Sequence, residues 1–280
     1  MRFSVVFAST ALALALPSPA GAQKASERPP HLAPHRVVYD LSLASSRGAR
    51  TIESARGRIA FDFTGDACEG YALKFRQVTV LESAESGTKT SDLRTANFES
   101  GDGRTFRFRN DTGSGEGPGQ SVDGNAERKP NGPLAVRLKS PKRDNVSLDS
   151  EAVFPNTQMR DLIAAAKAGR TTLSMKIFDG SDDGRTVYET LSVIGKKIEP
   201  GQVDALEEPA KQEGLSKLAR WPVTMSYFKL GKADLSPVYV LSFDVYENGV
   251  SRALRLDYGD FALKGEMTRL ELLPEKPCQR

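Results

Sequence analysis

Short runs in which apolar and polar residues alternate fill most of the chain after residue 35, and they predict β-strands. Successive side chains of a strand point to opposite faces, so such a run can bury one face and expose the other. Clear examples are RVVYDLSLA at 36–44, RGRIAFDF at 56–63, YALKFRQVTVLE at 71–82 and SPVYVLSFDVYENG at 236–249. Gly, Asn and Asp separate the runs, as expected for turns between strands.

Residues 155–169 interrupt this pattern and predict one helix of about three turns. Asn156 or Thr157 can cap its start, and Gly169 can end it. The apolar residues that share one face of this helix are Met159, Leu162, Ile163 and Ala166.

The order of the predicted elements favours a largely antiparallel sheet, because one helix leaves almost no crossovers for parallel strands. A dozen or more consecutive strands then form a sandwich, a closed barrel or an open, barrel-like spiral. The polar loop at 198–214 is the best candidate for a domain boundary, but no low-complexity linker divides the chain. We therefore expect a single domain over 35–280, with Asn248-Gly249 as a type I′ hairpin turn.

The first 22 residues differ from the rest and predict a secretory signal peptide at 1–22. Arg2 supplies a positive start, Val5–Leu16 an apolar stretch, and Ala20-Gly21-Ala22 a cleavage site of small residues. No later segment approaches the roughly 20 apolar residues of a membrane span, so we expect no transmembrane segment in the mature chain. Residues 23–34, rich in Pro and charge, predict a flexible leader.

Composition and charge indicate which classes of binding partner are expected. The 280 residues are 39% hydrophobic and 27% charged, which is typical of a globular protein. Because 39 Lys and Arg face 36 Asp and Glu, the formal charge is only +3. This balance gives no reason to expect nucleic acid or an anionic membrane as a partner.

Candidate catalytic and metal motifs fail in their details. The turn DGSDDG at 179–184 resembles the start of a calcium loop, but Thr190 stands where an EF-hand needs a bidentate Glu. The two histidines, His31 and His35, lie at the start of the mature chain, and there is no Gly-x-Ser-x-Gly motif. We therefore expect no catalytic residue, cofactor or metal, although a hydrolase that uses two carboxylates stays a distant alternative.

Aromatic residues are the candidates for a binding cavity. Most must belong to the core, but in a wide or incomplete barrel some line a cavity able to hold an acyl chain or an apolar peptide segment. The residues assigned to such a cavity or binding surface are Trp221, Tyr227, Phe228, Tyr246 and Tyr258. A barrel interior filled by these side chains is the alternative.

Cys68 and Cys278 are the two cysteines of the chain. In an exported protein two lone cysteines usually pair, and two buried free thiols are the alternative. Neither case gives a zinc site, because four well-placed ligands cannot be assembled.

Several segments, in a fixed order, carry a family resemblance. They are HRVVYDLSL at 35–43, the strand 57–63 leading to Cys68, VFPNTQMRDLIAAAKAG at 153–169, IFDGSDDG at 177–184, WPVTMSYF at 221–228, YENGVSRALRLDYGDFALKG at 246–265 and the terminal Cys278. Together they resemble the cell-envelope integrity protein EipB family of Gram-negative periplasms. One departure is Met159, which stands where the family pattern has a histidine, so no role of that histidine is carried over.

The resemblance implies an all-β fold: an open antiparallel β-barrel, described as a β-spiral, of about 14 strands with one short helix. It implies a disulfide that joins Cys68 to Cys278, and no known reaction. It also implies a periplasmic location, a role in envelope integrity under stress, a shape similar to periplasmic lipoprotein carriers, and a link to a periplasmic tetratricopeptide-repeat partner.

Three functions follow, in order of preference. The first is a non-enzymatic periplasmic protein that maintains cell-envelope integrity through protein–protein interaction. The second is a carrier of a lipid or a lipoprotein acyl chain in the barrel cavity. The third is an envelope hydrolase that uses two carboxylates.

Overall fold

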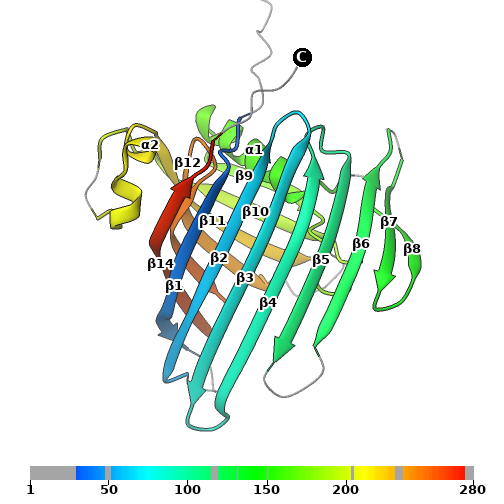
Figure 1. The fold of residues 1–280 in the computed structure, drawn as a ribbon, viewed down its shortest axis with the longest axis horizontal. Helices are drawn as coiled ribbons and strands as arrows, with labels where there is room; N and C mark the ends of the chain where they lie inside the picture. The colour runs from blue at the N-terminus through cyan, green and yellow to red at the C-terminus, as the bar shows by residue number, and fades with distance from the viewer. Residues whose placement is uncertain are drawn as a thin grey trace, which may run out of the picture.

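Strands dominate the structure, a computed structural model that describes residues 30–47, 52–114, 119–130, 132–149, 151–202, 205–230 and 236–274 (Figure 1). The strands are β1 (His35–Ser46), β2 (Ser54–Asp66), β3 (Gly70–Ser83), β4 (Gly87–Ser100), β5 (Thr105–Ser114), β6 (Gln120–Arg128), β7 (Leu134–Ser140), β8 (Asp144–Leu148), β9 (Thr172–Ile177), β10 (Tyr188–Ile194), β11 (Arg220–Lys229), β12 (Tyr239–Tyr246), β13 (Ser251–Asp257) and β14 (Phe261–Leu272). The helices are α1 (Pro155–Lys167), the short 3-10 helix η1 (Glu208–Lys211) and α2 (Glu213–Ser216). Within the described ranges, none of these helices is long and apolar enough to cross a membrane.

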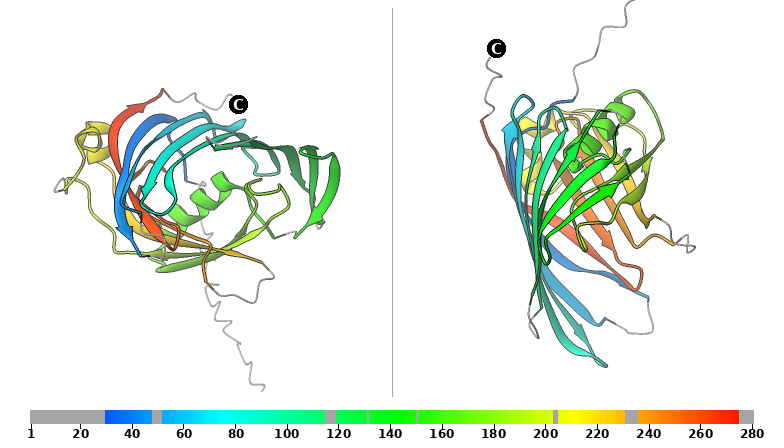
Figure 2. Two further views of the ribbon diagram at one scale, coloured as in Figure 1. Left: turned by 90° about the horizontal axis from the view of Figure 1, so that it is seen from below. Right: turned by 90° about the vertical axis from the view of Figure 1, so that its right-hand side faces the viewer.

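These strands form one 14-stranded sheet in the order β8-β7-β6-β5-β4-β3-β2-β1-β14-β13-β12-β11-β10-β9. Every neighbouring pair is antiparallel. β1 and β14 pair in the middle of the sheet, whereas β8 and β9 lie at its two ends. The sheet curves around without closing (Figure 2). The predicted all-β, open antiparallel barrel of about 14 strands is confirmed.

Alternating side chains give the sheet a buried concave face and a charged outer face. In β1, Val37, Tyr39 and Leu41 are buried, whereas Arg36 points outward and is exposed. Helix α1 lies on the concave side (Figure 2), where its Leu162 is fully buried. The sheet residues in the same core cluster include Phe63, Tyr71, Trp221, Val223 and Val245. Removing these apolar side chains from water is the main force that holds the helix on the sheet.

Helix α1 begins without the side-chain cap that the sequence suggests. Its N-cap residue is Phe154, which makes no capping side-chain hydrogen bond. Asn156 and Thr157 lie within the first turn, and their backbone N–H groups donate to the carboxylate of Glu99 at 2.7 and 2.9 Å. A residue of β4 therefore satisfies the free N–H groups at the helix start.

Residues 32–34 pack against the barrel, in contrast to the flexible leader predicted for 23–34. Leu32 is only 2% exposed and belongs to the core cluster around α1. The backbone N–H of Ala33 donates to the carbonyl oxygen of Asn248 at 2.8 Å. The packing of these residues departs from that expectation, because a segment without an apolar period can still bury several side chains, here Leu32, Ala33 and Pro34. Residues 23–29 and the predicted signal peptide lie outside the described residues.

The turn between β12 and β13 is not the predicted type I′ turn. Gly249 has a φ of +87°, but Asn248 is not among the residues with a positive φ. The N–H of Gly249 donates to the carbonyl of Tyr246, and the N–H of Tyr246 donates to the carbonyl of Val250. These bonds define a three-residue loop with its glycine in the left-handed region, a common alternative to the two-residue turn.

The polar segment at 198–214 contains η1 and leads into α2. The guanidinium of Arg252 on β13 holds this segment, because it donates to Glu207 at 2.5 Å and to Asp244 of β12 at 2.7 Å. Leu206, Ala210 and Leu215 of this region are buried.

Candidate functional site

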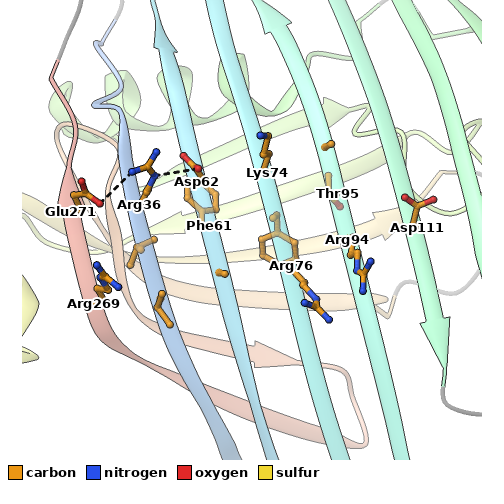
Figure 3. Close-up of a pocket in the computed structure, with 15 residues that line it drawn as sticks. Arg36, Phe61, Asp62, Lys74, Arg76, Arg94, Thr95, Asp111, Arg269 and Glu271 are labelled. Atoms are coloured by element: carbon orange, nitrogen blue, oxygen red, sulfur yellow. Dashed lines mark ion pairs between the residues drawn. The ribbon is translucent and has the colours of Figure 1, made fainter.

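A groove of about 560 Å³ crosses the outer face of the sheet, from β14 over β1, β2, β3 and β4 to β5 (Figure 3). Its floor includes the small side chains of Val38, Ala60 and Ala96. Because their neighbours on this face carry long charged side chains, these short residues leave a hollow between them. We call this feature the outer groove.

The strand register fixes two rows of side chains along the outer groove. The first row contains Arg269, Val38, Ala60, Arg76, Arg94 and Asp111 as successive cross-strand partners. The second row contains Glu271, Arg36, Asp62, Lys74 and Ala96. The two rows are two residues apart along each strand, so both point to the outer face.

One wall of the outer groove is an alternating row of charges. The guanidinium of Arg36 lies 3.3 Å from a carboxylate oxygen of Asp62 and 3.5 Å from one of Glu271 (Figure 3). The other oxygen of Asp62, Oδ1, is buried and accepts no hydrogen bond from a described residue. This wall therefore presents acceptors as well as cations.

The other wall is positively charged because one carboxylate serves two arginines. Arg76 donates two hydrogen bonds of 2.9 Å to Asp92, and Arg94 donates another of 2.7 Å. These two guanidinium groups lower the pKa of Asp92 to about 2. Asp111, the other acid at this end of the groove, is paired with Arg109 at 2.9 Å, so the two arginines that share Asp92 leave a net positive charge there.

Two further cations of the outer groove have no acidic partner among the described residues. Lys74 and Arg269 both line the groove, and neither makes an ion pair with any residue that the structure describes. Their charges are available to a bound anion, because no carboxylate within this part of the protein neutralises them by direct contact.

Tyr227 and Tyr258, two of the residues predicted to line a cavity, belong to a row of aromatic rings that runs from β10 to β14. The ring centroids of Tyr188, Tyr227, Tyr239, Tyr258 and Phe261 follow one another at 6.2, 5.8, 5.2 and 5.1 Å. The hydroxyl of Tyr258 accepts a hydrogen bond of 3.2 Å from Gln77 on β3. Tyr258 is 39% exposed, so part of this aromatic row is accessible.

The other three predicted residues lie elsewhere. Trp221 and Tyr246 are 4% and 0% exposed and belong to the hydrophobic core. Phe228 lies on the outer side, in a second groove that exposed Leu191 also lines. The structure therefore brings together only Tyr227 and Tyr258 of the five.

Two carboxylates whose pKa values are raised, buried Glu99 and partly buried Asp179, serve local structure. Burial raises the pKa of Glu99 and of Asp179. Glu99 accepts hydrogen bonds at the start of α1, and Asp179 accepts one of 2.9 Å from the backbone N–H of Ser181. In the described ranges, no three His, Cys, Asp or Glu side chains are grouped so as to hold a metal ion.

Cys68 lies in the turn between β2 and β3, and Cys278 lies outside the described residues. Phe63 of β2 and Leu272 of β14 are both paired with His35. Because β2 and β14 are each antiparallel to β1, both strands leave the sheet at this same end. Cys68 and Cys278 each follow these paired positions by a few residues, so the disulfide stays a prediction that the register favours.

Comparison with known proteins identifies the family of this chain. The sequence profile of a family described as EipB-like matches residues 26–274. The cell envelope integrity protein EipB of Brucella abortus (strain 2308) is 36% identical over 242 residues, which cover 86% of this chain and 84% of that protein. The chain belongs to the EipB-like family. This confirms the resemblance that the ordered segments carry.

A solved structure agrees with the EipB-like assignment. The crystal structure of a β-barrel-like protein of the domain of unknown function DUF1849, from Brucella abortus, superposes with a TM-score of 0.79 at 34% sequence identity. The match covers 87% of this EipB-like chain and 99% of that chain. The likeness thus extends over most of the spiral.

Sequence reasoning did not find the outer groove of this EipB-like chain. Arg36, Lys74 and Arg76 occupy outward positions of predicted strands, where charges are usually solvated, so they gave no signal of a site. The usable signal was the small residue at an outward position, Ala60 or Ala96, between charged neighbours. Only the register shows that these positions adjoin Arg269, more than 150 residues away in the chain.

Proposed function

We propose that this chain maintains the cell envelope as a non-enzymatic periplasmic protein that binds a partner protein in the outer groove. The name of the Brucella relative, a cell envelope integrity protein, supports the envelope role. The predicted signal peptide supports a location in the periplasm. The outer groove is the observation that carries the proposal.

The form of the outer groove suits a polypeptide. It crosses six strands, it is open, and its small floor residues allow another chain to approach the sheet closely. Arginine is enriched where proteins bind one another, and four of the lining residues are arginines: Arg36, Arg76, Arg94 and Arg269. The strands beneath are hydrogen-bonded on both sides, so the lining is held in place before binding.

The proposal of a non-enzymatic role rests on the partners of the groove acids. Asp62 and Glu271 flank Arg36, and Arg109 donates to Asp111 at 2.9 Å. The Arg109 guanidinium lowers the pKa of the Asp111 carboxyl, and a carboxylate with a lowered pKa is a weak base, which disfavours acid–base catalysis by this residue. A hydrolase is therefore the least favoured of the three functions.

Site-specific photo-crosslinking in cells tests the protein-binding proposal. A photoreactive amino acid replaces Ala60 or Ala96 in the groove floor, and exposed Thr224 on the outer face of β11 is the control position. We expect one adduct of the same mass from both groove positions and none from Thr224. We also expect Ala60→Trp, which fills the groove, to abolish the Ala96 adduct and to increase sensitivity to detergent. No adduct from either groove position would count against the proposal.

A second candidate function, the carriage of a lipid or a lipoprotein acyl chain, is favoured by the partly exposed aromatic row. Tyr258 and its neighbours offer apolar ring faces that a bound chain could cover. Native mass spectrometry of protein purified from envelopes tests it, with Tyr239→Ala as the variant. Co-purified lipid that is lost in the variant would support this function, and bare protein in both samples would contradict it.

A further inference from the structure

We propose that the outer groove binds an extended, acidic segment of the partner, with carboxylates about four residues apart. This inference rests on the proposed function and specifies the chemistry of the partner. It follows from the charge of the groove, from the spacing of Arg269 and Arg76 and from the form of its floor.

The charge of the outer groove favours an anionic occupant. Five cations line it, Arg36, Lys74, Arg76, Arg94 and Arg269, against three acids, Asp62, Asp111 and Glu271. The excess is concentrated on Lys74 and Arg269, which have no acidic contact in the described part of the chain, and on the two arginines that share Asp92. Carboxylates can form charge-assisted hydrogen bonds with these groups without displacing an existing ion pair.

The spacing of the cations sets the spacing of the carboxylates. Arg269 of β14 and Arg76 of β3 lie in one register row with Val38 and Ala60 between them. Three strand-to-strand steps of about 4.8 Å separate their backbones by about 14 Å. An extended chain rises about 3.3 Å per residue, so carboxylates about four residues apart reach both Arg269 and Arg76.

The floor of the outer groove fits the chain between those carboxylates. Val38 and Ala60 occupy the positions between Arg269 and Arg76, and both are short and apolar. A segment laid across the strands can place small apolar side chains over them. An isolated phosphate lacks the length to contact both arginines, and the backbone N–H groups beneath it are engaged in the sheet.

An anionic membrane surface is a poorer match than a peptide. Asp62 and Glu271 alternate with Arg36 along one wall, so they would face the phosphates of a lipid layer. A polypeptide can place a neutral or basic residue opposite these acids and its own acids opposite Lys74 and Arg269.

Two isomeric peptides of about ten residues test the inference with the full mature chain. Both contain two glutamates in an alanine and serine background. In one the glutamates are four residues apart, and in the other they are adjacent. We expect the spaced peptide to bind about tenfold more tightly than its isomer in fluorescence anisotropy at low salt. Equal affinity for the two isomers would overturn the proposed spacing.

Charge reversal locates the binding. The double variant Lys74→Glu/Arg269→Glu removes the two unpaired cations, and Lys264→Glu, on the exposed face of β14 outside the groove, is the matched control. We expect loss of binding of the spaced peptide in the double variant and wild-type binding in the control. The milder pair Lys74→Gln/Arg269→Gln, with circular dichroism spectra of all variants, excludes misfolding as the cause. Equal losses in the double variant and in Lys264→Glu would show non-specific attraction and refute the site.

Competition distinguishes the sources of negative charge. If vesicles of phosphatidylglycerol or millimolar inorganic phosphate displace the peptide and bind in the same Lys74- and Arg269-dependent way, the peptide assignment is wrong. The crosslinking experiment stays independent of this one. Adducts at Ala60 and Ala96 without binding of the acidic peptide would reject the acidic segment and retain the protein partner.

Discussion

The carboxylate of Glu99 accepts hydrogen bonds from both the backbone N–H and the hydroxyl of Thr157, at 2.9 and 2.6 Å. Glu99 lies on β4 and is fully buried, whereas Thr157 lies in the first turn of α1. Arg160, one turn further along, brings a guanidinium nitrogen to 3.8 Å from the same carboxylate. This contact joins the helix to the concave face and places a negative charge at the positive end of its dipole.

Glu99→Gln should lower the free energy of unfolding by about 2 kcal/mol, because its amide group would turn a donor toward the donors of the helix start. Chemical denaturation checks this, with Glu266→Gln, at an exposed position of β14, as the control. The control should lie within about 0.5 kcal/mol of the wild type. Equal stability of Glu99→Gln and the wild type would show that the cap is dispensable.

Gly249→Ala should destabilise the protein more than Gly259→Ala. Both glycines have a positive φ, of +87° and +88°, so both substitutions strain the backbone by about 1 kcal/mol. A Cβ at position 249 would also lie 2.7 Å from Cδ2 of Leu32, whereas position 259 is open. Thermal unfolding of both variants isolates the contact with Leu32. Equal melting temperatures would mean that residue 32 moves away without cost.

Asp92 should titrate near pH 2, and Arg76→Met should raise its pKa toward the ordinary value of 3.8. Because the pKa is lower in the folded state, the folded protein takes up this proton at a lower pH than the unfolded chain does. The stability from this group is therefore present above about pH 4 and is lost as the pH falls to about 2. Carbon NMR of the carboxyl group measures the pKa directly. An Asp92 midpoint near 3.8 in the wild type would contradict the shared contact with Arg76 and Arg94.

Cys68→Ser should lower the melting temperature in non-reducing buffer, because the predicted link to Cys278 closes a long loop. The chain-entropy argument gives about 5 kcal/mol for such a loop as an upper value. Cys278→Ser should have the same effect. Dithiothreitol should lower the melting temperature of the wild type to that of the variants. Identical melting of all three proteins without reductant would falsify the link.

The strands were predictable from sequence because the alternation of Val37, Tyr39 and Leu41 with outward residues is a local signal. The capping of α1 was not, because Glu99 is distant in the chain and only the packing of the helix on β4 brings it near. For the same reason Trp221 and Tyr246 could not be separated from Tyr258: a buried and an exposed aromatic residue look alike in a strand pattern. Their exposed fractions depend on what the fold places over them.

The candidate site was harder to predict than the fold, because it depends on register. A one-residue shift between β1 and β2 would turn Ala60 away from the outer face and remove the groove floor. Sequence alternation indicates which residues share a face within one strand, but not which residue of the next strand lies opposite. The match between Arg269 and Val38 needs the pairing of the first strand with the last.

Because β1 pairs with β14, the sheet is a single up-and-down meander in which the first strand of the chain lies in the middle and not at an edge. Read from β9 to β14 and then from β1 to β8, each strand is followed by its spatial neighbour. The segments that precede β1 and follow β14 already touch, since the N–H of Leu273 donates to the carbonyl of Pro34 at 2.8 Å. During synthesis β1 can pair with β2 early, but its other edge cannot pair until β14, the last strand, has been made. A circular permutant that joins these segments and opens the chain after β8 would make every strand pairing local in sequence, and we expect it to fold faster for that reason.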